Sequence, residues 1–391
     1  MQRRIQAVLL KEESTAGGDA TPTPADDALG LAGMFSFVRN ADVQDPDEVT
    51  GALDDAEFHL GRVSAQMTLP LYLKGSGTAG DAPQVGLPLR ACAFGETLQA
   101  TAVPTTGTTT ATAGTTNSFD VDTAVASDWS TTDGAYEGMP VTLSGNPATP
   151  VTTIVTKYTV AAGTATVEVA HTFDAALDTS TEAKIEPCAV YVPASTSVPH
   201  VTGYGYEDGV VDKLVGAQGT FNAQMTVGQV GRIEFTFTGR ALAQADATFP
   251  AVTVEATRPP VWKNGVSLLN GSPVGVNGLS LSPNHTVVQP DDPNGIEGYD
   301  VPQIVGPRRI QGQIDPNRRL VATESVVAAF LNGTTGVIHA QAGKTAGNKY
   351  AITCRRAKYR GVESGERGGI SMQNVPFSAL GSDDETWFTF W

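Results

Sequence analysis

A glycine-rich segment, Gly75-Ser76-Gly77-Thr78-Ala79-Gly80, has the residue spacing of a dinucleotide-binding turn. In that chemistry the glycines let the backbone approach a pyrophosphate, which is held at the N-terminus of a helix that begins there. Here Asp81-Ala82-Pro83 follows the last glycine, Pro88 comes soon after, and the chain shows no alternation of strands and helices. The segment is therefore better explained as a flexible glycine turn after a strand.

The other reactive residue types show no arrangement typical of a catalytic or metal site. The five histidines and three cysteines lack the spacing of zinc ligands, and no nucleophile-elbow or phosphate-loop motif is present. Residues 291–297 gather carboxylate and amide oxygens as calcium loops do, but they lack the full ligand repeat, which favours an Asx-rich turn. Distant residues can still meet in a fold, so a catalytic triad is not excluded. We predict no catalytic residue, no cofactor-binding residue and no metal ligand.

The charge balance of the 391-residue chain limits its partners. Lys plus Arg number 25 and Asp plus Glu number 41, a formal net charge of −16. This sign argues against a protein that grips nucleic acid, because phosphate affinity comes from cationic side chains, but it allows a surface that DNA slides past. No stretch approaches the roughly 18 apolar residues of a membrane span. We expect no membrane partner, and we expect the widely spaced Cys92, Cys188 and Cys354 to be buried in a reducing compartment.

Alternation with period two dominates the pattern and predicts β-strands. Residues 62–73 alternate apolar and polar side chains, and residues 220–238 form two alternating arms around a glycine turn at 228–231. This hairpin points Phe, Ala, Met and Ile toward a core and Thr, Asn, Gln and Glu toward water. Further strands are expected at residues 4–10, 164–170, 308–314, 349–354 and 386–391.

Helices are expected to be few. One is predicted near residues 324–332, with Thr323 as its cap, an apolar stripe of Val326, Val327, Phe330 and Leu331, and Gly333 as its stop. A second short helix at residues 25–31 has weaker support. The fold class is therefore all-β with one flanking helix and long loops, which include residues 259–303.

Composition divides the chain into a discontinuous domain and an insertion. Residues 101–117 are rich in threonine and poor in apolar side chains, which predicts a linker. Residues 118–187 have their own strand and their own aromatic residues, so they are predicted to form a small inserted β-domain. Residues 1–100 and 188–391 would then form one domain. The insertion would either add bulk to an outer surface, the favoured interpretation, or bind a host surface or glycan.

An acidic run between residues 40 and 58 contains seven Asp or Glu and no Lys or Arg. Such runs are usually solvated loops; the alternative is a loop that docks on basic residues of a partner. Arg308, Arg309, Arg318 and Arg319, or the basic residues between 355 and 367, offer such a surface. If both surfaces belong to the same protein, the pairing implies head-to-tail self-assembly.

Several motifs in order resemble the major tail tube proteins of long-tailed, siphovirus-like bacteriophages. The matching segments cover much of residues 1–95 and 190–391 and comprise Gly17-Gly18-Asp19-Ala20-Thr21-Pro22-Thr23, residues 71–83, Leu89-Arg90-Ala91-Cys92-Ala93-Phe94, the block from Asp208-Gly209 to Gly239, Gly347-Asn348-Lys349-Tyr350 and Gly365-Glu366-Arg367-Gly368-Gly369. The region 101–187 departs from the pattern, so the resemblance says nothing of its role.

The resemblance implies a β-sandwich subunit that stacks as hexameric rings into a tube, with DNA passing through an inner β-barrel. It further implies a virion tail component assembled in the bacterial host cytoplasm, and as partners the chain itself, the tape measure protein, viral DNA bound without sequence specificity, and the tail terminator and tip proteins. Expected channel residues are Asn222, Gln224, Thr226, Glu234 and Thr236. Expected ring-to-ring docking residues are Asp45, Asp47, Glu48, Asp54 and Asp55.

Two other classes of function stay open from the sequence. A capsid decoration or adhesin protein shares the β-rich, acidic, threonine-heavy composition but has no reason to form open tubes. A secreted carbohydrate-active enzyme also uses β-modules, but it needs paired carboxylates in a cleft and usually an export signal. We predict a structural, non-enzymatic protein.

Overall fold

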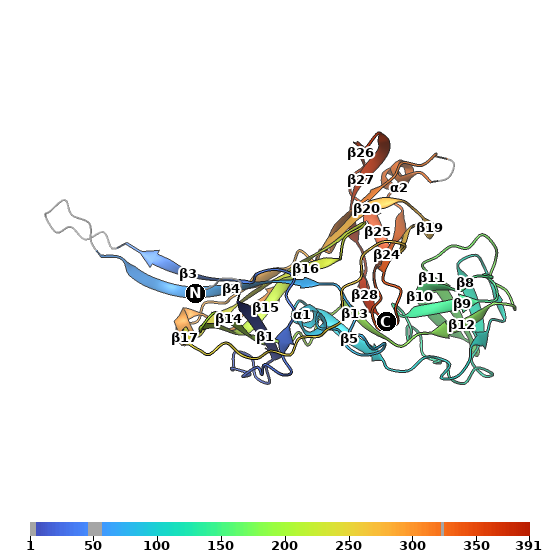
Figure 1. Ribbon diagram of the computed structural model, residues 1–391. Coiled ribbons are helices and arrows are strands. Elements are labelled where there is room, and N and C mark those ends of the chain that lie inside the picture. The colour runs from blue at the N-terminus through green and yellow to red at the C-terminus, as the bar shows by residue number, and fades with distance from the viewer. Residues whose placement is uncertain (1–4, 46–56, 322–323) are drawn as a thin grey trace.

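The computed structural model describes residues 5–45, 57–321 and 324–391 (Figure 1). Within these residues the protein is all-β, as predicted, and every strand pairing is antiparallel. Nineteen strands form one continuous network, seven form a second sheet, and two form a small ribbon. We call the nineteen-stranded part the body and the seven-stranded part the module.

The body combines the two ends of the chain. Its strands are β1 (Gln6–Glu12), β2 (Ala28–Leu29), β3 (Ser36–Gln44), β4 (His59–Tyr72), β5 (Phe94–Gln99), β13 (Cys188–Pro193), β14 (Val201–Glu207), β15 (Val210–Thr226), β16 (Arg232–Ala241), β17 (Ala245–Asp246), β18 (Val266–Leu269), β19 (Ser272–Pro273), β20 (Val276–Ser282), β23 (Gln311–Pro316), β24 (Thr335–Ala342), β25 (Tyr350–Tyr359), β26 (Glu363–Arg367), β27 (Ile370–Ala379) and β28 (Trp387–Phe390). The ribbon is β21 (Thr286–Val288) with β22 (Gln303–Val305).

The module contains β6 (Thr109–Thr110), β7 (Ala113–Gly114), β8 (Ser118–Asp122), β9 (Pro140–Ser144), β10 (Val151–Ala161), β11 (Thr164–Val169) and β12 (Glu182–Ile185). Two of these strands lie within residues 101–117, where the sequence predicted a linker. Thr109 pairs with Ala183, and Ala111 is buried. Threonine suits a pleated, half-buried surface, so this segment completes the sheet even though it has little apolar surface of its own.

The helices differ in part from the prediction. Helix α2 (Val326–Asn332) ends at Gly333 as expected, but the Ser325 hydroxyl caps it by accepting a hydrogen bond from the Ala328 backbone N–H. Thr323, the expected cap, lies outside the described residues. The second helix predicted at residues 25–31 is wrong, because strand β2 forms there and pairs with β1.

Two other short helical elements were not predicted. Helix α1 (Gly86–Arg90) has only five residues, and the single 3₁₀ turn η1 (Ile296–Gly298) lies in a loop. The glycine turn of residues 75–80 leads, through Pro83, into α1, and no parallel βαβ unit surrounds it among the strands described.

The module is fixed to the body by a shared core. Its apolar cluster includes the body residues Trp387 and Trp391, and Trp387 packs against Gly138 of the module. Gly138 has φ +80°, and its carbonyl oxygen accepts a hydrogen bond from the Thr389 hydroxyl at 2.7 Å. The module and the body therefore share buried surface, and the module is packed against the body instead of being joined to it only by flexible linkers.

Candidate self-assembly surfaces

Five neighbouring strands, in the order β4–β16–β15–β20–β23, present one polar side, which we call the polar face. The five predicted channel residues all lie on it. Asn222, Gln224 and Glu234 are exposed, while Thr226 and Thr236 are partly exposed. The structure therefore brings the predicted residues together on one surface; whether that surface lines a channel stays a prediction.

The strand register gives the polar face its continuity. Asn222 lies opposite Glu234, and Thr236 lies between Thr220 of β15 and Thr68 of β4. Because successive strands keep the same alternation, each polar side chain has another polar side chain beside it. The result is a broad hydroxyl and amide surface.

The opposite side of the same strands is the main core. Phe221, Phe235 and Phe237 are buried there, and their ring centroids lie 5.8 Å apart for Phe221 and Phe235 and 5.9 Å apart for Phe235 and Phe237. Interlocking aromatic rings of this size hold the strands in one register. The polar face is therefore a rigid surface, which a loop of the same composition would not provide.

The hairpin's share of the polar face carries almost no net charge. Arg232 and Glu234 are its charged residues among positions 220–238, and they cancel formally. The Arg232 guanidinium lies 5.7 Å from the centre of the Tyr72 ring, which holds the side chain against β4. A surface of this kind offers a passing polyanion little to grip.

The strand series that carries the polar face extends through β3 beyond β4 and through β27 to β26 beyond β23, and it ends in two open edges. Among the described residues β3 pairs only with β4, and β26 pairs only with β27. An unpaired strand edge exposes backbone N–H and C=O groups that can pair with another chain. Both edges belong to the strand series that carries the polar face.

Strand β3 and the first half of β4 form an arm, described for residues 36–45 and 57–64, that projects well beyond the rest of the body (Figure 1). Both sides of this ribbon are open to solvent, and Val38, Val43, Phe58 and Leu60 are exposed on it. A two-stranded ribbon is at best marginally stable alone in water. The arm therefore has the properties of a segment that is completed by a partner.

One arginine ties the arm to a body loop. Arg62 donates to Asp42 at 2.9 Å and to Asp291, and its guanidinium lies 5.1 Å from the centre of the Tyr299 ring. The hydrogen bond with Asp42, followed by the charge of Asp291, raises the pKa of Arg62 above its ordinary value, so the group stays cationic. This contact fixes the direction in which the arm leaves the body.

The expected docking residues belong to the acidic run between residues 40 and 58. Asp45 directly follows β3 and is exposed. Asp47, Glu48, Asp54 and Asp55 lie outside the described residues. Their predicted role in docking is not tested by the structure.

Many of the basic residues that the sequence offered as partners are used within the chain. Those with in-chain partners are Arg308 with Asp383 and Glu385, Arg319 with Glu324, Arg355 with Glu137 and Asp384, Arg356 with Asp384, and Arg367 with Asp315. Arg309, Arg318, Lys358 and Arg360 are exposed and form no ion pair with any described residue.

Two of these unpaired cations, Lys358 and Arg318, lie on segments next to α2, and Arg360 follows Lys358 by two residues. Lys358 pairs through its backbone register with Thr335, just after the helix, and the Arg318 N–H donates to the Ser371 carbonyl of β27. Large apolar side chains are exposed on the same segments, namely Leu320, Val321, Val327, Leu331 and Ile370. We call this combination the α2 surface. The sequence misplaced Val327 and Leu331, which were expected to pack against the core, because helical periodicity does not distinguish a core from a partner.

Among residues 5–45, 57–321 and 324–391, no cluster of three or more His, Cys, Asp or Glu could hold a metal ion, and no helix is long and apolar enough to cross a membrane. The loop at residues 291–297 is an Asx turn, in which the Asp292 carboxylate accepts from the Asn294 backbone N–H at 2.9 Å. The three cysteines are free and buried, as predicted.

No curated protein matches the sequence. The family model described as "Phage tail tube protein" matches residues 4–379, a range that includes the module. This range is nearly the whole chain and contains the polar face, the arm and the α2 surface. The chain belongs to the phage tail tube protein family and is a component of the virion tail.

Proposed function

We propose that the chain polymerises as stacked rings, six copies to a ring, around a channel through which DNA passes to the host. The observation that carries this proposal is the polar face, a rigid and nearly neutral sheet surface whose strand series ends in two open edges. When the open edge of one copy pairs with the open edge of the next, the backbone N–H and C=O groups of both edges gain hydrogen-bond partners. The joined sheets then close into a barrel with the polar face inside.

The arm and the α2 surface supply the second set of contacts in this proposal. The arm is acidic and apolar, and the α2 surface is basic and apolar, so their charges and exposed side chains are complementary. A contact between two different surfaces of the same chain repeats head to tail and builds a filament when it does not close. Asp45, Asp47, Glu48, Asp54 and Asp55 are the proposed acidic docking residues.

Within this proposal the chain is a structural subunit, not an enzyme. A tape measure protein and DNA occupy the channel, and terminator and tip proteins cover the two ends. The polar face touches DNA without sequence specificity, because its hydroxyl and amide groups provide no repeated phosphate grip.

Electron microscopy of the purified, concentrated protein tests the proposal. We expect hollow filaments or stacked rings with a central stain-filled channel. Ring symmetry is then read from end-on views. A protein that remains monomeric at high concentration, including in the presence of isolated tail tips as an initiator, would contradict it and favour a decoration or adhesin role.

A further inference from the structure

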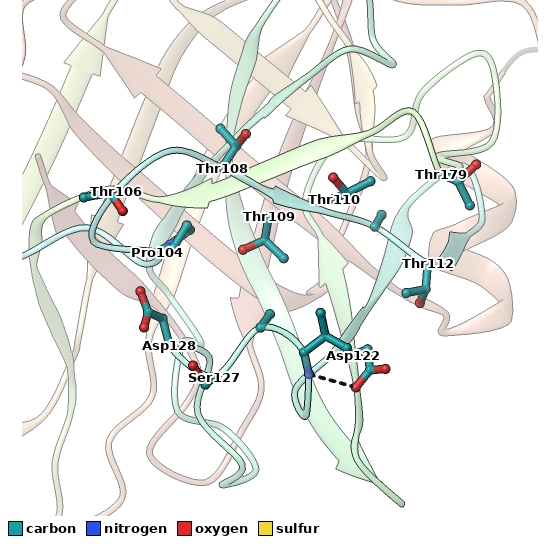
Figure 2. A pocket seen from close by; sticks show the side chains of 13 residues that line it. Pro104, Thr106, Thr108, Thr109, Thr110, Thr112, Asp122, Ser127, Asp128 and Thr179 are labelled. Carbon is teal, nitrogen blue, oxygen red and sulfur yellow. Dashed lines mark hydrogen bonds between the residues drawn. The ribbon is translucent and has the colours of Figure 1, made fainter.

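The module contains a solvent-open cavity of about 750 Å³ that the tube contacts do not use. It lies between the Thr-rich segment, the turn after β8 and Thr179, and all of its lining residues belong to the module (Figure 2). A volume of this size falls in the usual range of small-molecule sites.

Hydroxyl groups dominate the polar lining of the cavity. Thr106, Thr110, Ser127 and Thr179 all border it (Figure 2), and their side chains form no hydrogen bond with the described residues. Each hydroxyl can donate one hydrogen bond and accept others. The cavity therefore offers unused donors and acceptors from several strands and turns at once.

Two carboxylates complete the polar lining, and each has one oxygen already used. Asp122 Oδ1 accepts from the Ala124 backbone N–H at 2.9 Å, and Asp128 Oδ2 accepts from the Thr105 backbone N–H at 3.1 Å. These bonds fix the position of both side chains. The second oxygen of each carboxylate accepts no hydrogen bond and forms no ion pair among the described residues.

The composition of the lining excludes several ligand classes. It contains no Lys, Arg or His, so nothing there attracts a phosphate or sulfate group. It contains no aromatic side chain, so it has no platform for a nucleic-acid base. The described residues also offer no group of three ligands for a metal ion.

The walls of the cavity are held in place from behind. The Trp129 indole N–H donates to the Thr109 hydroxyl at 2.8 Å, and the Ala111 backbone N–H donates to the Thr181 carbonyl at 2.8 Å. Trp129 is itself buried in the module core. A wall that is ordered before binding loses little conformational entropy when a ligand arrives.

We propose that this cavity binds a neutral oligosaccharide. A sugar presents hydroxyl edges and C–H faces side by side, and threonine presents a hydroxyl and a methyl group in the same way. The free oxygens of Asp122 and Asp128 accept hydrogen bonds from sugar hydroxyls, and such charge-assisted bonds are stronger than neutral ones. The proposal is independent of tube formation, because every lining residue lies in the module.

Saturation-transfer NMR and calorimetry on the full-length protein, with maltotriose, cellotriose and chitotriose as probes, test the proposal. We expect at least one probe to bind, and Asp128→Asn to weaken that binding by about tenfold because it removes the charge of the acceptor. The isosteric Thr110→Val variant, which removes one hydroxyl and little volume, should weaken it in the same direction. Asp174→Asn, an exposed module residue outside the cavity, is the matched control and should change nothing.

Three results would overturn the proposal. The first is that none of the three sugars binds. The second is binding that both Asp128→Asn and Thr110→Val leave unchanged although both variants have the near-UV circular dichroism of the native protein. The third is that spermidine binds in the cavity and the sugars do not, which would make it a site for cations.

Discussion

Asn222 on β15 and Glu234 on β16 lie directly opposite each other, and both side chains are exposed on the polar face. The pair combines a neutral amide with a carboxylate, so neither residue attracts phosphate. Arg232, the nearby cation, is held over the Tyr72 ring. The polar face thus offers a polyanion few groups that would hold it.

Adding cations to this face should change how the tube treats DNA. We expect Asn222→Lys with Gln224→Lys to assemble normally but to retain DNA, with each new phosphate contact making the slope of log affinity against log salt more negative by about 0.9. The measurement is DNA co-sedimentation with assembled tubes across a salt series. The control is Ala175→Lys with Ala176→Lys, which adds the same charge to an exposed loop of the module. Equal retention by both variants would contradict the placement of the polar face in the channel.

The hairpin and its two faces were predictable because period-two alternation over two arms leaves one arrangement that buries Phe221, Phe235 and Phe237 together. Helix α1 could not be predicted from the sequence, because its five residues include a glycine and a proline and are too few for a periodic signal. Strand β6 was missed because its partner, β12, lies about seventy residues further along the chain, and local composition does not reveal it. Strand β7 pairs with the nearby β8 but has only two residues, too few for a periodic signal.

The assembly surfaces were only half predictable for a related reason. Alternation continues along β4 from buried Met67 and Ala65 to the only partly buried Val63, so the apolar pattern does not mark where the core ends and the arm begins. Exposed Leu331 has the helical spacing of a core residue as well. An apolar side chain that contacts another protein occurs at the same sequence spacing as one that packs within its own chain.

Reversing charge on the arm should stop growth of the tube. We expect Asp54→Lys with Asp55→Lys to leave the monomer folded but to block tube formation, because like charges then meet at the docking contact. The measurement is filament length by negative-stain electron microscopy. Asp81→Lys with Asp174→Lys, at exposed positions away from the arm, changes the net charge equally and should form tubes of normal length.

A compensating change identifies the receiving surface. Adding Lys358→Glu and Arg360→Glu to the arm variant should restore tubes if the arm docks on the α2 surface. The same two substitutions in the native chain should block growth. Tubes of normal length from the arm variant itself would remove the docking role of these aspartates.

The junction between module and body should depend on one arginine. Arg355 on β25 donates to Glu137 of the module at 3.2 Å and to Asp384 at 3.1 Å, with its side chain 22% exposed. We expect Arg355→Met to lower the free energy of unfolding by about 1–2 kcal/mol, because two carboxylates lose a shared partner at a half-buried site. Arg356→Met is the matched control. Its guanidinium is 3.8 Å from Asp384 and more exposed, so we expect a change below about 0.5 kcal/mol. Chemical denaturation of both variants makes the comparison, and equal effects would show that Arg355 does not secure the module.

Acid should destabilise the protein through a buried histidine. Burial lowers the pKa of His339 from its ordinary 6.5 to about 4, and His171 adds to this effect through its charge. Between these two values the unfolded chain binds a proton that the folded chain does not, so stability rises with pH and is lost on acidification. The full effect of this one group is about 3 kcal/mol.

A variant isolates that contribution from the carboxylates that also titrate in acid. We expect His339→Gln to lose part of the pH dependence between about 4 and 6.5, measured as the free energy of unfolding in denaturant at a series of pH values. The comparison reads the slope and not the absolute stability, so it remains valid even when the substitution itself weakens the core. Identical slopes for the native chain and His339→Gln would show that His339 titrates alike in the folded and unfolded states.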